Sequence, residues 1–478
     1  MNAKKLIILC ICAVLIIGGI IAAVAGNRPG PDPTESSGEA LLRYQEAMPK
    51  TDTPDLVIKI KHEKETSVNG EGFLETATQT LRYKDRGSAS FVGIMQEQRT
   101  IGDYSISIEE AYANGTGYFT VQGSKFSGVL SAEDYLNRYV PAVLIDPSLY
   151  ENITANKDGA LTTITFSDAK APESWMKEHN SGFLRAEGSV QLTPNDLLHE
   201  SNYVVSYSTN GTYIRHSITV TIDLEDSLGM YPPFDEDSYT SITYLDGPRM
   251  LEIACGYILS SSNITSTFNS HISCDAFGDT REEQIFLNMT EGTAWSARLD
   301  TDVTLTNTGR EGDVSQLSKT ELFTNGNYTV FTNGIEDSDI TPVDQETFQT
   351  WCNDILVGTI MLPQYLSDVA LLETAEVLHI SYTANEDFVQ HIGQNACQTL
   401  YREPELLTQL AQAHTTDHLE AYMDFDLSTG LPISAGIRYK GTYIINDVPY
   451  LLVFEADQSY NVLSRTAYNA IYEKAGVH

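Results

Sequence analysis

Few residues in this chain have types and spacings that could carry chemistry. His414 and His418 lie four residues apart, and on one helical face such a pair could ligate zinc. No glutamate follows His414, as the base of a zinc protease would require, so ordinary solvated histidines are the favoured interpretation. The acidic run Asp235-Glu236-Asp237 offers the oxygen ligands that calcium takes. It lacks the spacing of a calcium-binding loop, so we expect a solvated linker there.

The sequence also lacks nucleophile and cofactor motifs. It contains no G-x-S-x-G elbow, no phosphate-binding loop and no G-x-G-x-x-G fingerprint. The charged stretch His62–Glu65 is expected at the end of a strand, where charge keeps a sheet edge from pairing. We therefore expect a protein that is not an enzyme and that has no cofactor and no metal site.

Four cysteines lie outside the N-terminal segment: Cys255, Cys274, Cys352 and Cys397. Four thiols in a chain of 478 residues are too few for a disulfide scaffold. Cys255 and Cys274 are predicted on neighbouring strands, and Cys352 and Cys397 in two helical segments. These are the disulfide pairs that we consider first, and free buried thiols fit the sequence equally well.

The N-terminus has the form of a membrane-targeting segment. Lys4 and Lys5 precede an uncharged apolar run of 20 residues from Leu6 to Ala25. A helix of that length matches a hydrocarbon core of about 30 Å. Residues 1–26 are therefore predicted to be a signal anchor, with a signal peptide cut after Ala25 as the alternative. The first predicts a single-pass protein of the cell membrane with its C-terminal ectodomain outside the cytoplasm, and the second predicts a secreted protein.

The charge balance limits the partners. The chain has 65 acidic and 29 basic side chains, which gives a net charge of −36. This charge repels phosphate backbones and anionic headgroups, so we expect no nucleic-acid partner and contact with the membrane only through the N-terminal helix. Residues 27–52 are rich in proline, glycine, serine and acidic residues and are predicted to be a flexible linker.

Beyond residue 53 the chain consists of short β-type segments, and the order of segments in the first half recurs in the second half. Apolar and polar residues alternate with the period of two that is typical of half-buried antiparallel strands. Glu110–Gly115 recurs as Glu321–Gly326, 211 residues later, and both copies contain an Asn-Gly pair that predicts a tight hairpin. Three further correspondences follow in the same order: Ser131 with Thr341 as helix starts, Ile164–Phe166 with Ile380–Tyr382, and Tyr203–Gly211 with Tyr422–Gly430.

These correspondences predict a tandem duplication, with one domain at residues 53–247 and a second at residues 248–478. The alternative is two unrelated β-rich domains that share only turn chemistry. Apolar residues at helical spacing follow each hairpin. Six of the residues with this spacing are taken as candidate site residues: Tyr135, Tyr139, Val143, Phe348, Trp351 and Ile355. Because such faces need a surface to cover, we predict an α+β class, in which each unit is a curved antiparallel β-sheet with helices packed across one face.

The aromatic hairpins Tyr112–Tyr118 and Phe323–Tyr328, each followed by a predicted helix, make both units resemble the lipoprotein-carrier superfold of LolA and LppX/LprG. The resemblance implies an apolar cavity between sheet and helices that accepts acyl chains. It implies that the six residues above line this cavity, and a closed core is the alternative interpretation. The expected function is an exported, membrane-tethered binding or sensing protein of the cell envelope that holds a lipid-like or apolar ligand. The alternatives are an envelope protein-interaction or signalling module and a hydrolase without a recognisable motif.

Overall fold

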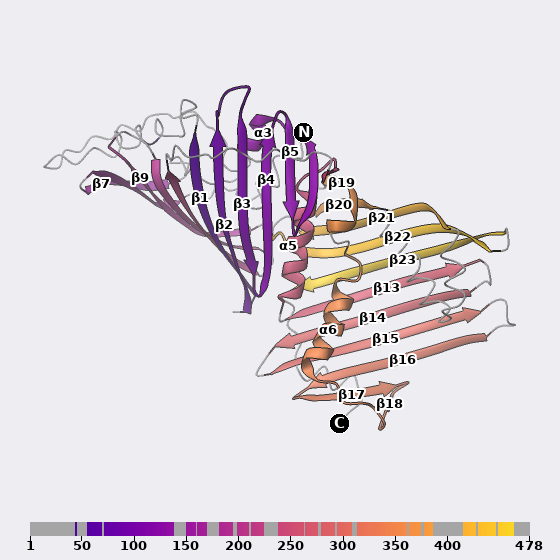
Figure 1. The fold of residues 1–478 in the computed structure, drawn as a ribbon. Coiled ribbons are helices and arrows are strands. Elements are labelled where there is room, and N and C mark those ends of the chain that lie inside the picture. Colours follow the sequence, from indigo (N-terminus) through magenta and orange to yellow (C-terminus); the bar gives the residue numbers. More distant parts are fainter. Residues whose placement is uncertain are drawn as a thin grey trace. The chain divides into compact units, whose positions relative to one another are not determined.

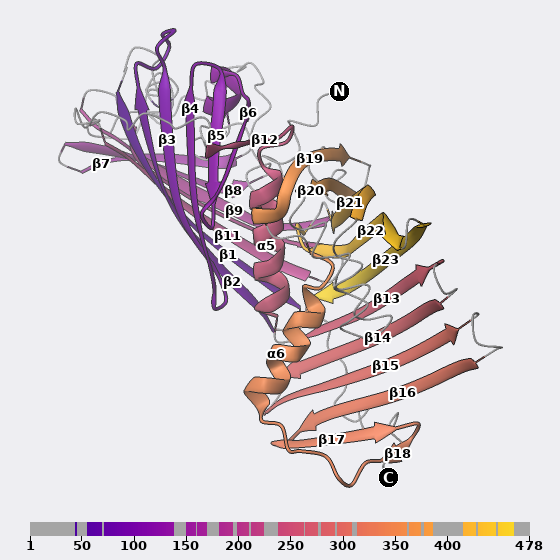
Figure 2. The same ribbon diagram turned by 45° about the vertical axis from the view of Figure 1, so that its right-hand side comes forward.

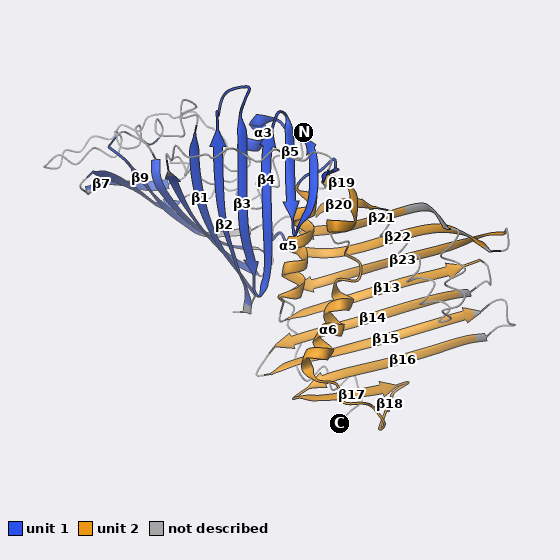
Figure 3. Cartoon of the chain, viewed as in Figure 1, with its two compact units in different colours: residues 1–245, 427–430 blue, residues 246–426, 431–478 orange. Residues whose placement is uncertain are grey.

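The structure of the chain is a computed structural model. It describes residues 44, 55–68, 71–137, 150–158, 160–169, 181–194, 198–209, 212–223, 238–261, 263–275, 279–291, 294–307, 313–360, 363–373, 377–385, 414–426, 429–445 and 448–462. The chain divides into two compact units, residues 1–245 with 427–430 and residues 246–426 with 431–478 (Figure 3).

The first unit is built on a twelve-stranded sheet, called sheet 1 here. Its strands are β1 (Leu56–Val68), β2 (Glu71–Lys84), β3 (Val92–Ile101), β4 (Tyr104–Ala113), β5 (Thr116–Val121), β6 (Ser124–Val129), β7 (Tyr150–Asp158), β8 (Leu161–Ala169), β9 (Ser181–Leu192), β10 (Leu198–Thr209), β11 (Thr212–Asp223) and β12 (Thr240–Ser241). Their order across the sheet is β12-β6-β5-β4-β3-β2-β1-β11-β10-β9-β8-β7 (Figure 1). The β12–β6 pair is parallel, whereas β1 pairs antiparallel with both β2 and β11.

The second unit is built on an eleven-stranded sheet, called sheet 2. Its strands are β13 (Ile264–Cys274), β14 (Asp279–Glu291), β15 (Trp295–Asn307), β16 (Asp313–Thr324), β17 (Asn327–Thr332), β18 (Ile335–Glu336), β19 (Leu366–Glu373), β20 (Val377–Ala384), β21 (His414–Asp426), β22 (Pro432–Ile445) and β23 (Val448–Val462). Their order is β18-β17-β16-β15-β14-β13-β23-β22-β21-β20-β19 (Figure 2). Apart from the extra strand β12, both sheets follow the same path: one meander runs outward from the central strand, and a second returns to pair with it.

The predicted α+β class is wrong. The described residues contain 23 strands but only three α-helices, α3 (Ala132–Asn137), α5 (Gly247–Leu259) and α6 (Gln345–Leu356), with one 3₁₀ turn at Pro363–Tyr365. The protein is therefore mostly β, because strands of up to 15 residues use most of the chain in their ladders. The helical spacings in the sequence mark short segments and do not amount to a helical layer.

The Asn-Gly hairpins are confirmed in both sheets. Asn114 and Gly115 have φ of 52° and 82°, and Asn325 and Gly326 have φ of 51° and 77°. Positive φ at both central residues is the geometry of a type I′ turn, which Asn-Gly adopts at low cost. The turns join β4 to β5 and β16 to β17, which take the same place in the two strand orders.

The two predicted helix starts differ in outcome. Ser131 caps α3, because its Oγ accepts from the backbone N–H of Asp134 at 3.0 Å. Thr341 does not begin α6. Asp344 is the N-cap of that helix, and its Oδ1 accepts from the backbone N–H of Thr347 at 2.8 Å. A carboxylate is a strong cap, so it moves the helix start three residues along from the predicted one.

One predicted correspondence between the two halves is wrong. Tyr203 lies on β10, whose place in the other sheet is held by β22, whereas Tyr422 lies on β21. The other three correspondences fall on elements that hold the same place in the two units. Common ancestry of the units stays a prediction.

The predicted N-terminal anchor, residues 1–26, lies outside the described residues. Of residues 27–52, predicted to be a linker, the structure describes Tyr44, which is buried and whose ring lies 5.9 Å from that of Phe166. Within the segments that the structure describes, no helix is long and apolar enough to span a bilayer.

Candidate functional site

Two of the residues predicted to line an apolar cavity lie in closed aromatic clusters. In the first unit, Tyr135 of α3 is completely buried. Its ring lies 5.6 Å from that of Tyr112, 6.1 Å from that of Phe91 and 6.2 Å from that of Tyr83. Gly93 on β3 lies beneath it, and a Cβ there would come within 2.2 Å of the Tyr135 ring. The Tyr135 side chain therefore fills the space over the sheet.

In the second unit, Phe348 of α6 is also completely buried, and its ring lies 5.3 Å from that of Tyr328 and 6.2 Å from that of Phe323. Trp351 is 41% exposed and Ile355 is half-buried. Tyr139 and Val143, the remaining predicted cavity residues, lie outside the described residues. The described members of the predicted set lie in the two units as expected, and an apolar cavity lined by them stays a prediction.

The face of sheet 1 that carries Tyr135 also carries buried charges. We call this face the inner face of sheet 1. Side chains point alternately to the two faces along a strand. Every second residue counted from Tyr83 on β2, and from Gly93 on β3, therefore lies on the inner face. Five of the buried polar residues on this face, which we call the polar cluster, are His62 on β1, Glu75 and Gln79 on β2, and Glu97 and Arg99 on β3.

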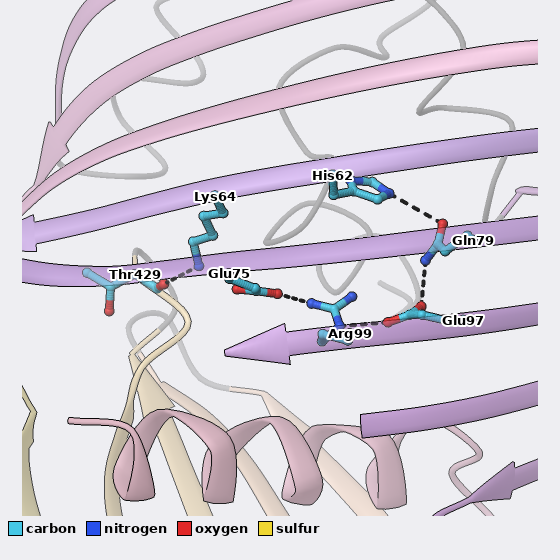
Figure 4. Close-up of polar contacts among 7 residues, drawn as sticks. All are labelled: His62, Lys64, Glu75, Gln79, Glu97, Arg99 and Thr429. Atoms are coloured by element: carbon cyan, nitrogen blue, oxygen red, sulfur yellow. Dashed lines mark hydrogen bonds and ion pairs between the residues drawn. The ribbon is translucent and has the colours of Figure 1, made fainter. Parts of the chain in front are cut away.

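Hydrogen bonds connect all five members of the polar cluster (Figure 4). The side-chain amide of Gln79 donates to Glu97 Oε2 at 2.6 Å, and Arg99 Nε donates to Glu97 Oε1 at 2.6 Å. Arg99 Nη1 also donates to Glu75. One guanidinium thus binds two carboxylates, and each of these three side chains is less than 10% exposed.

His62 completes the chain of hydrogen bonds, and its tautomer follows from them. Its Nε2 lies 3.3 Å from Gln79 Oε1. Since the amide nitrogen of Gln79 donates to Glu97, the amide oxygen faces His62, and His62 Nε2 must carry the proton. Nδ1 is then a bare acceptor. It is buried and has no hydrogen-bond partner in the part of the chain that the structure describes.

A second histidine, His216 on β11, stacks on His62. Their ring centroids are 5.6 Å apart and the ring planes are inclined by 24°. Burial lowers the pKa of His62 to about 4, with the charge of Arg99 acting in the same direction. Burial also lowers the pKa of His216 to about 3, and the neighbouring His62 adds to this effect. Both rings are therefore neutral near pH 7.

The register of the ladders shows what sheet 2 has at the same positions. Tyr112 pairs with Gly93, and Phe323, at the same hairpin position, pairs with Ala297. Gly93 and Ala297 thus hold the same position. Starting from this pair and following the strand pairings gives the residue of sheet 2 that corresponds to each member of the polar cluster. His62, Gln79, Glu97, Arg99 and His216 correspond to Ser270, Ile285, Thr301, Val303 and Phe454. None of these five residues is charged, but Glu283, at the place of Ala77, forms one charge pair with Arg281 on the same face of sheet 2.

The place of Glu75 is the exception, because Arg281 holds it in sheet 2. Arg281 donates to Glu283 at 2.8 Å, so this charge has a partner on its own strand.

The sequence pattern missed the polar cluster. His62–Glu65 was expected at a strand end, but β1 is a central strand and His62 is buried within it. The sequence contains one signal for it. Glu75 and Gln79 are separated from Leu81 and Tyr83 by even numbers of residues along β2, so all four side chains point to the same face. Recognising the cluster needs the register between strands, which alternation along one strand does not supply.

The other predicted sites behave differently. His414 begins strand β21, so the pair with His418 does not lie on a helical face. Asp235-Glu236-Asp237 and Cys397 lie outside the described residues. Within the described segments, no group of three or more His, Cys, Asp or Glu side chains is placed to hold a metal ion.

The three cysteines that the structure describes, Cys255, Cys274 and Cys352, are buried and form no disulfide bond. The expected Cys255–Cys274 bond is not formed, since Cys255 lies on α5 and not on a strand next to β13. Pro248 lies in the first turn of this helix, where proline is tolerated, and Leu251, Cys255 and Ile258 are buried along one face of it. The helical spacing of these three residues was present in the sequence and could have predicted α5.

Comparisons with known proteins give little further. No family model matches the chain, and no curated protein matches it. Among solved structures, it is similar to LprF from Mycobacterium bovis, with 7% identity over 46% of this chain and 95% of that one at a TM-score of 0.24. It is also similar to a candidate AttH protein from Nitrosomonas europaea, with 8% identity over 91% of this chain and 98% of that one at a TM-score of 0.14. The expected resemblance to the LolA and LppX/LprG carriers is met in part by LprF, at a score too low to assign a family or a function.

Proposed function

We propose that this chain is an exported, membrane-tethered binding protein of the cell envelope, and that its first unit holds a lipid-like ligand on the inner face of sheet 1. The polar cluster contacts the polar part of the ligand. The observation that carries the proposal is a set of buried charges that the fold itself does not require.

Buried ion pairs are poor stabilisers. Removing two carboxylates and a guanidinium from water costs several kcal/mol for each ion, and their mutual attraction rarely returns more than that. Sheet 2 builds the same strand order with Ile285, Thr301 and Val303 at three of the central positions. Sheet 2 thus builds this strand order with the single charge pair Arg281–Glu283 on this face, and the larger set of polar groups in sheet 1 supports a role in binding.

The inner face of sheet 1 has an apolar zone next to the polar cluster. Ile58 and Ile60 precede His62 on β1, and Leu81 follows Gln79 on β2. All three apolar side chains are at most 1% exposed. Adjacent apolar and polar zones on one face match a molecule with an apolar body and a polar head, which supports a lipid-like ligand.

The proposal contains no catalytic step. Arg99 binds both Glu75 and Glu97, so neither carboxylate is poised as a general base. The neutral rings of His62 and His216 stack on each other, and neither is oriented by a carboxylate, as a catalytic histidine commonly is.

Native mass spectrometry of the full chain, extracted from its own membrane, tests this function. We expect a co-purifying lipid-like molecule on the wild-type protein. A variant with an apolar cluster, called the apolar variant, should lose it; its substitutions are His62→Phe, Glu75→Leu, Gln79→Leu, Glu97→Leu and Arg99→Met. The matched control is Arg281→Met with Glu283→Leu, which removes the charge pair of sheet 2 and should keep the ligand. Wild-type protein without any bound lipid, or equal loading of all three proteins, would refute the proposal.

A further inference from the structure

We infer that the β6 edge of sheet 1 is a docking site for an extended protein segment, and that residues 238–245 of the same chain occupy it. We call these residues the strap. In place of the strap, the site accepts an uncharged segment of a partner protein in which an aromatic residue is followed three and six residues later by aliphatic ones. The inference goes beyond the proposed ligand, because the site uses the outermost strands of sheet 1 and no member of the polar cluster.

The strap adds a short parallel strand to the sheet. Its strand β12 pairs with β6, and Ser241 lies opposite Ser127 (Figure 2). The backbone N–H of Ile242 then donates to the carbonyl oxygen of Ser127 at 2.8 Å. The other strand pairs described in sheet 1 are antiparallel. A segment that joins the edge of a sheet from elsewhere has the geometry in which many proteins bind an extended peptide.

Two glycines shape the edge for the strap. A Cβ on Gly128 of β6 would come within 2.8 Å of the carbonyl oxygen of Ile242. A Cβ on Gly117 of β5 would come within 2.7 Å of Leu245 Cδ1. Ile242 and Leu245 are 4% and 7% exposed, so both are held against the sheet. A glycine in a strand is typical of a place where another backbone approaches closely, and these two glycines leave the room that the strap fills.

An aromatic contact holds the other end of the strap. The ring centroid of Tyr239 lies 5.2 Å from that of Tyr118 on β5, and the ring planes meet at 73°. The ammonium of Lys125 on β6 lies 5.5 Å from the centroid of the Tyr239 ring, and it donates to Ser238 Oγ at 3.4 Å. The site thus recognises one aromatic residue and two aliphatic ones, at spacings of three residues.

The strap covers the edge only in part. Its ladder with β6 is two residues long, and Ser238, Thr240 and Ser241 are exposed. Val129, the last residue of β6, is 98% exposed, so the end of the strand stays uncovered. A pairing with so few buried contacts opens at low cost. A partner segment that stays extended to the end of β6 would form further backbone hydrogen bonds and cover Val129, which the strap does not.

Sheet 2 shows that this strand order does not need a strap. β18 holds the place of β6 and ends at Glu336, and no described strand lies beyond it in that sheet. Exposed Asp337 and Asp339 follow β18. A short edge strand with charged neighbours is a common protection against pairing. In contrast, Lys125 is the one charged residue of β6, so the edge of sheet 1 is suited to pairing.

The chemistry of the strap also limits the partner. The sequence of residues 238–245, SYTSITYL, contains no charged side chain. A second copy of the chain would offer the same segment, but two chains that each have a net charge of −36 repel one another. The site therefore suits a different protein with an uncharged segment of this type.

A reversible lock on the strap tests the inference. Ser127→Cys with Ser241→Cys places two thiols on directly opposite residues of neighbouring strands, where a disulfide bond can form. The probe is a fluorescein-labelled peptide of residues 238–245, and its anisotropy is measured with the full chain. The peptide should bind the reduced form at least about tenfold more tightly than the oxidised form, because only the reduced form can release the strap. Equal affinity for the two forms, or no binding to either, would overturn the inference.

Further variants separate the site from the strap. Ile242→Ser weakens the strap within the chain, so the labelled peptide should bind at least about tenfold more tightly than it binds the wild-type chain. Adding Gly128→Val to this variant blocks the edge and should abolish binding. The matched control is Thr240→Ser, at an exposed position of the strap, which should leave the affinity as in the wild type. Peptide binding that Gly128→Val leaves intact would contradict the site.

Hydrogen exchange on the wild-type chain needs no variant. The amide of Ile242 should exchange at least about tenfold faster than the amides that pair β4 with β5, because the strap opens without unfolding the sheet. If the Ile242 amide exchanges as slowly as those of β4 and β5, the strap is released only when the unit unfolds, and the inference fails.

Size-exclusion chromatography identifies the occupant. The wild-type chain should elute as a monomer at the concentrations of the binding assay. A dimer that the oxidised lock abolishes would show that a second copy exchanges its strap, and it would overturn the assignment of the site to a different protein.

Discussion

The two sheets of this protein follow one strand order, yet they use some of their buried polar groups differently. In sheet 2, the buried side chain of Gln458 donates to the carbonyl of Ile355 at 3.0 Å, and Tyr460 donates to that of Leu356 at 3.0 Å. These carbonyls end helix α6, so the chain uses its own polar groups to satisfy its own backbone. In sheet 1, the polar cluster satisfies its carboxylates but leaves His62 Nδ1 open.

This difference distinguishes polar side chains that stabilise the fold from polar side chains that we propose to bind a ligand. Every hydrogen bond given above for Gln458 and Tyr460 serves the helix end, so their replacement should affect the fold first. The polar cluster adds an open acceptor and further charges to a sheet whose counterpart has one charge pair, Arg281–Glu283, on the same face. The comparison is the reason for proposing the binding site in the first unit.

The largest expected effect comes from breaking the polar cluster on one side only. Arg99→Met leaves Glu75 and Glu97 buried without their cation and should destabilise the first unit by about 3–5 kcal/mol. Hydrogen exchange on β2 and β3 measures this loss in one unit. The control is Lys61→Met, which removes an exposed partner of Glu63 and should cost less than about 1 kcal/mol. Equal effects of the two substitutions would show that the cluster is not an enclosed ionic network.

A smaller effect is expected from pH. The pKa of His62 is about 4 in the folded chain and 6.5 in the unfolded one, so the unfolded chain binds more protons between these values. Stability is therefore full above pH 6.5 and falls as the pH is lowered toward 4. When the pH is lowered from 7 to 5, the proton uptake linked to His62 alone should reduce the free energy of unfolding of the first unit by about 2 kcal/mol.

His62→Gln provides the comparison for this pH dependence. Denaturation of the variant at the two pH values should show a difference smaller by that amount. Glu75, Glu97, Arg99 and His216 face His62 and are unchanged in the variant. A wild-type chain whose first unit is equally stable at both pH values would contradict the buried neutral ring.

The smallest effect concerns the aromatic clusters. Gly93 and Ala297 hold the same register position, but only Gly93 lies against a ring at a distance that excludes a Cβ. Gly93→Ala should therefore displace Tyr135 and cost about 1–2 kcal/mol. Ala297→Gly should cost about 0.5–1 kcal/mol through backbone entropy. Near-UV circular dichroism reports the tyrosine environment, and an unchanged spectrum for Gly93→Ala would show that Tyr135 does not pack on the bare backbone.

Tight turns and a helix cap could be predicted from the sequence. The hairpins at Asn114 and Asn325 depend on two residues each, and the cap at Ser131 on four. The fold class and the polar cluster could not be predicted, because both depend on residues that are far apart in the chain. His62, Gln79, Glu97 and His216 meet only through the registers of four strands, and no spacing along one strand reveals them.

The most direct test is the stability of the apolar variant, measured by hydrogen exchange on β2 and β3 of the full chain. If the polar cluster serves binding, replacing all five members with apolar side chains of similar size should leave the first unit as stable as the wild type or more stable, by up to about 4 kcal/mol, while the co-purifying ligand is lost. A loss of several kcal/mol would mean that the charges hold the sheet together, and it would contradict the assignment of the cluster to a ligand.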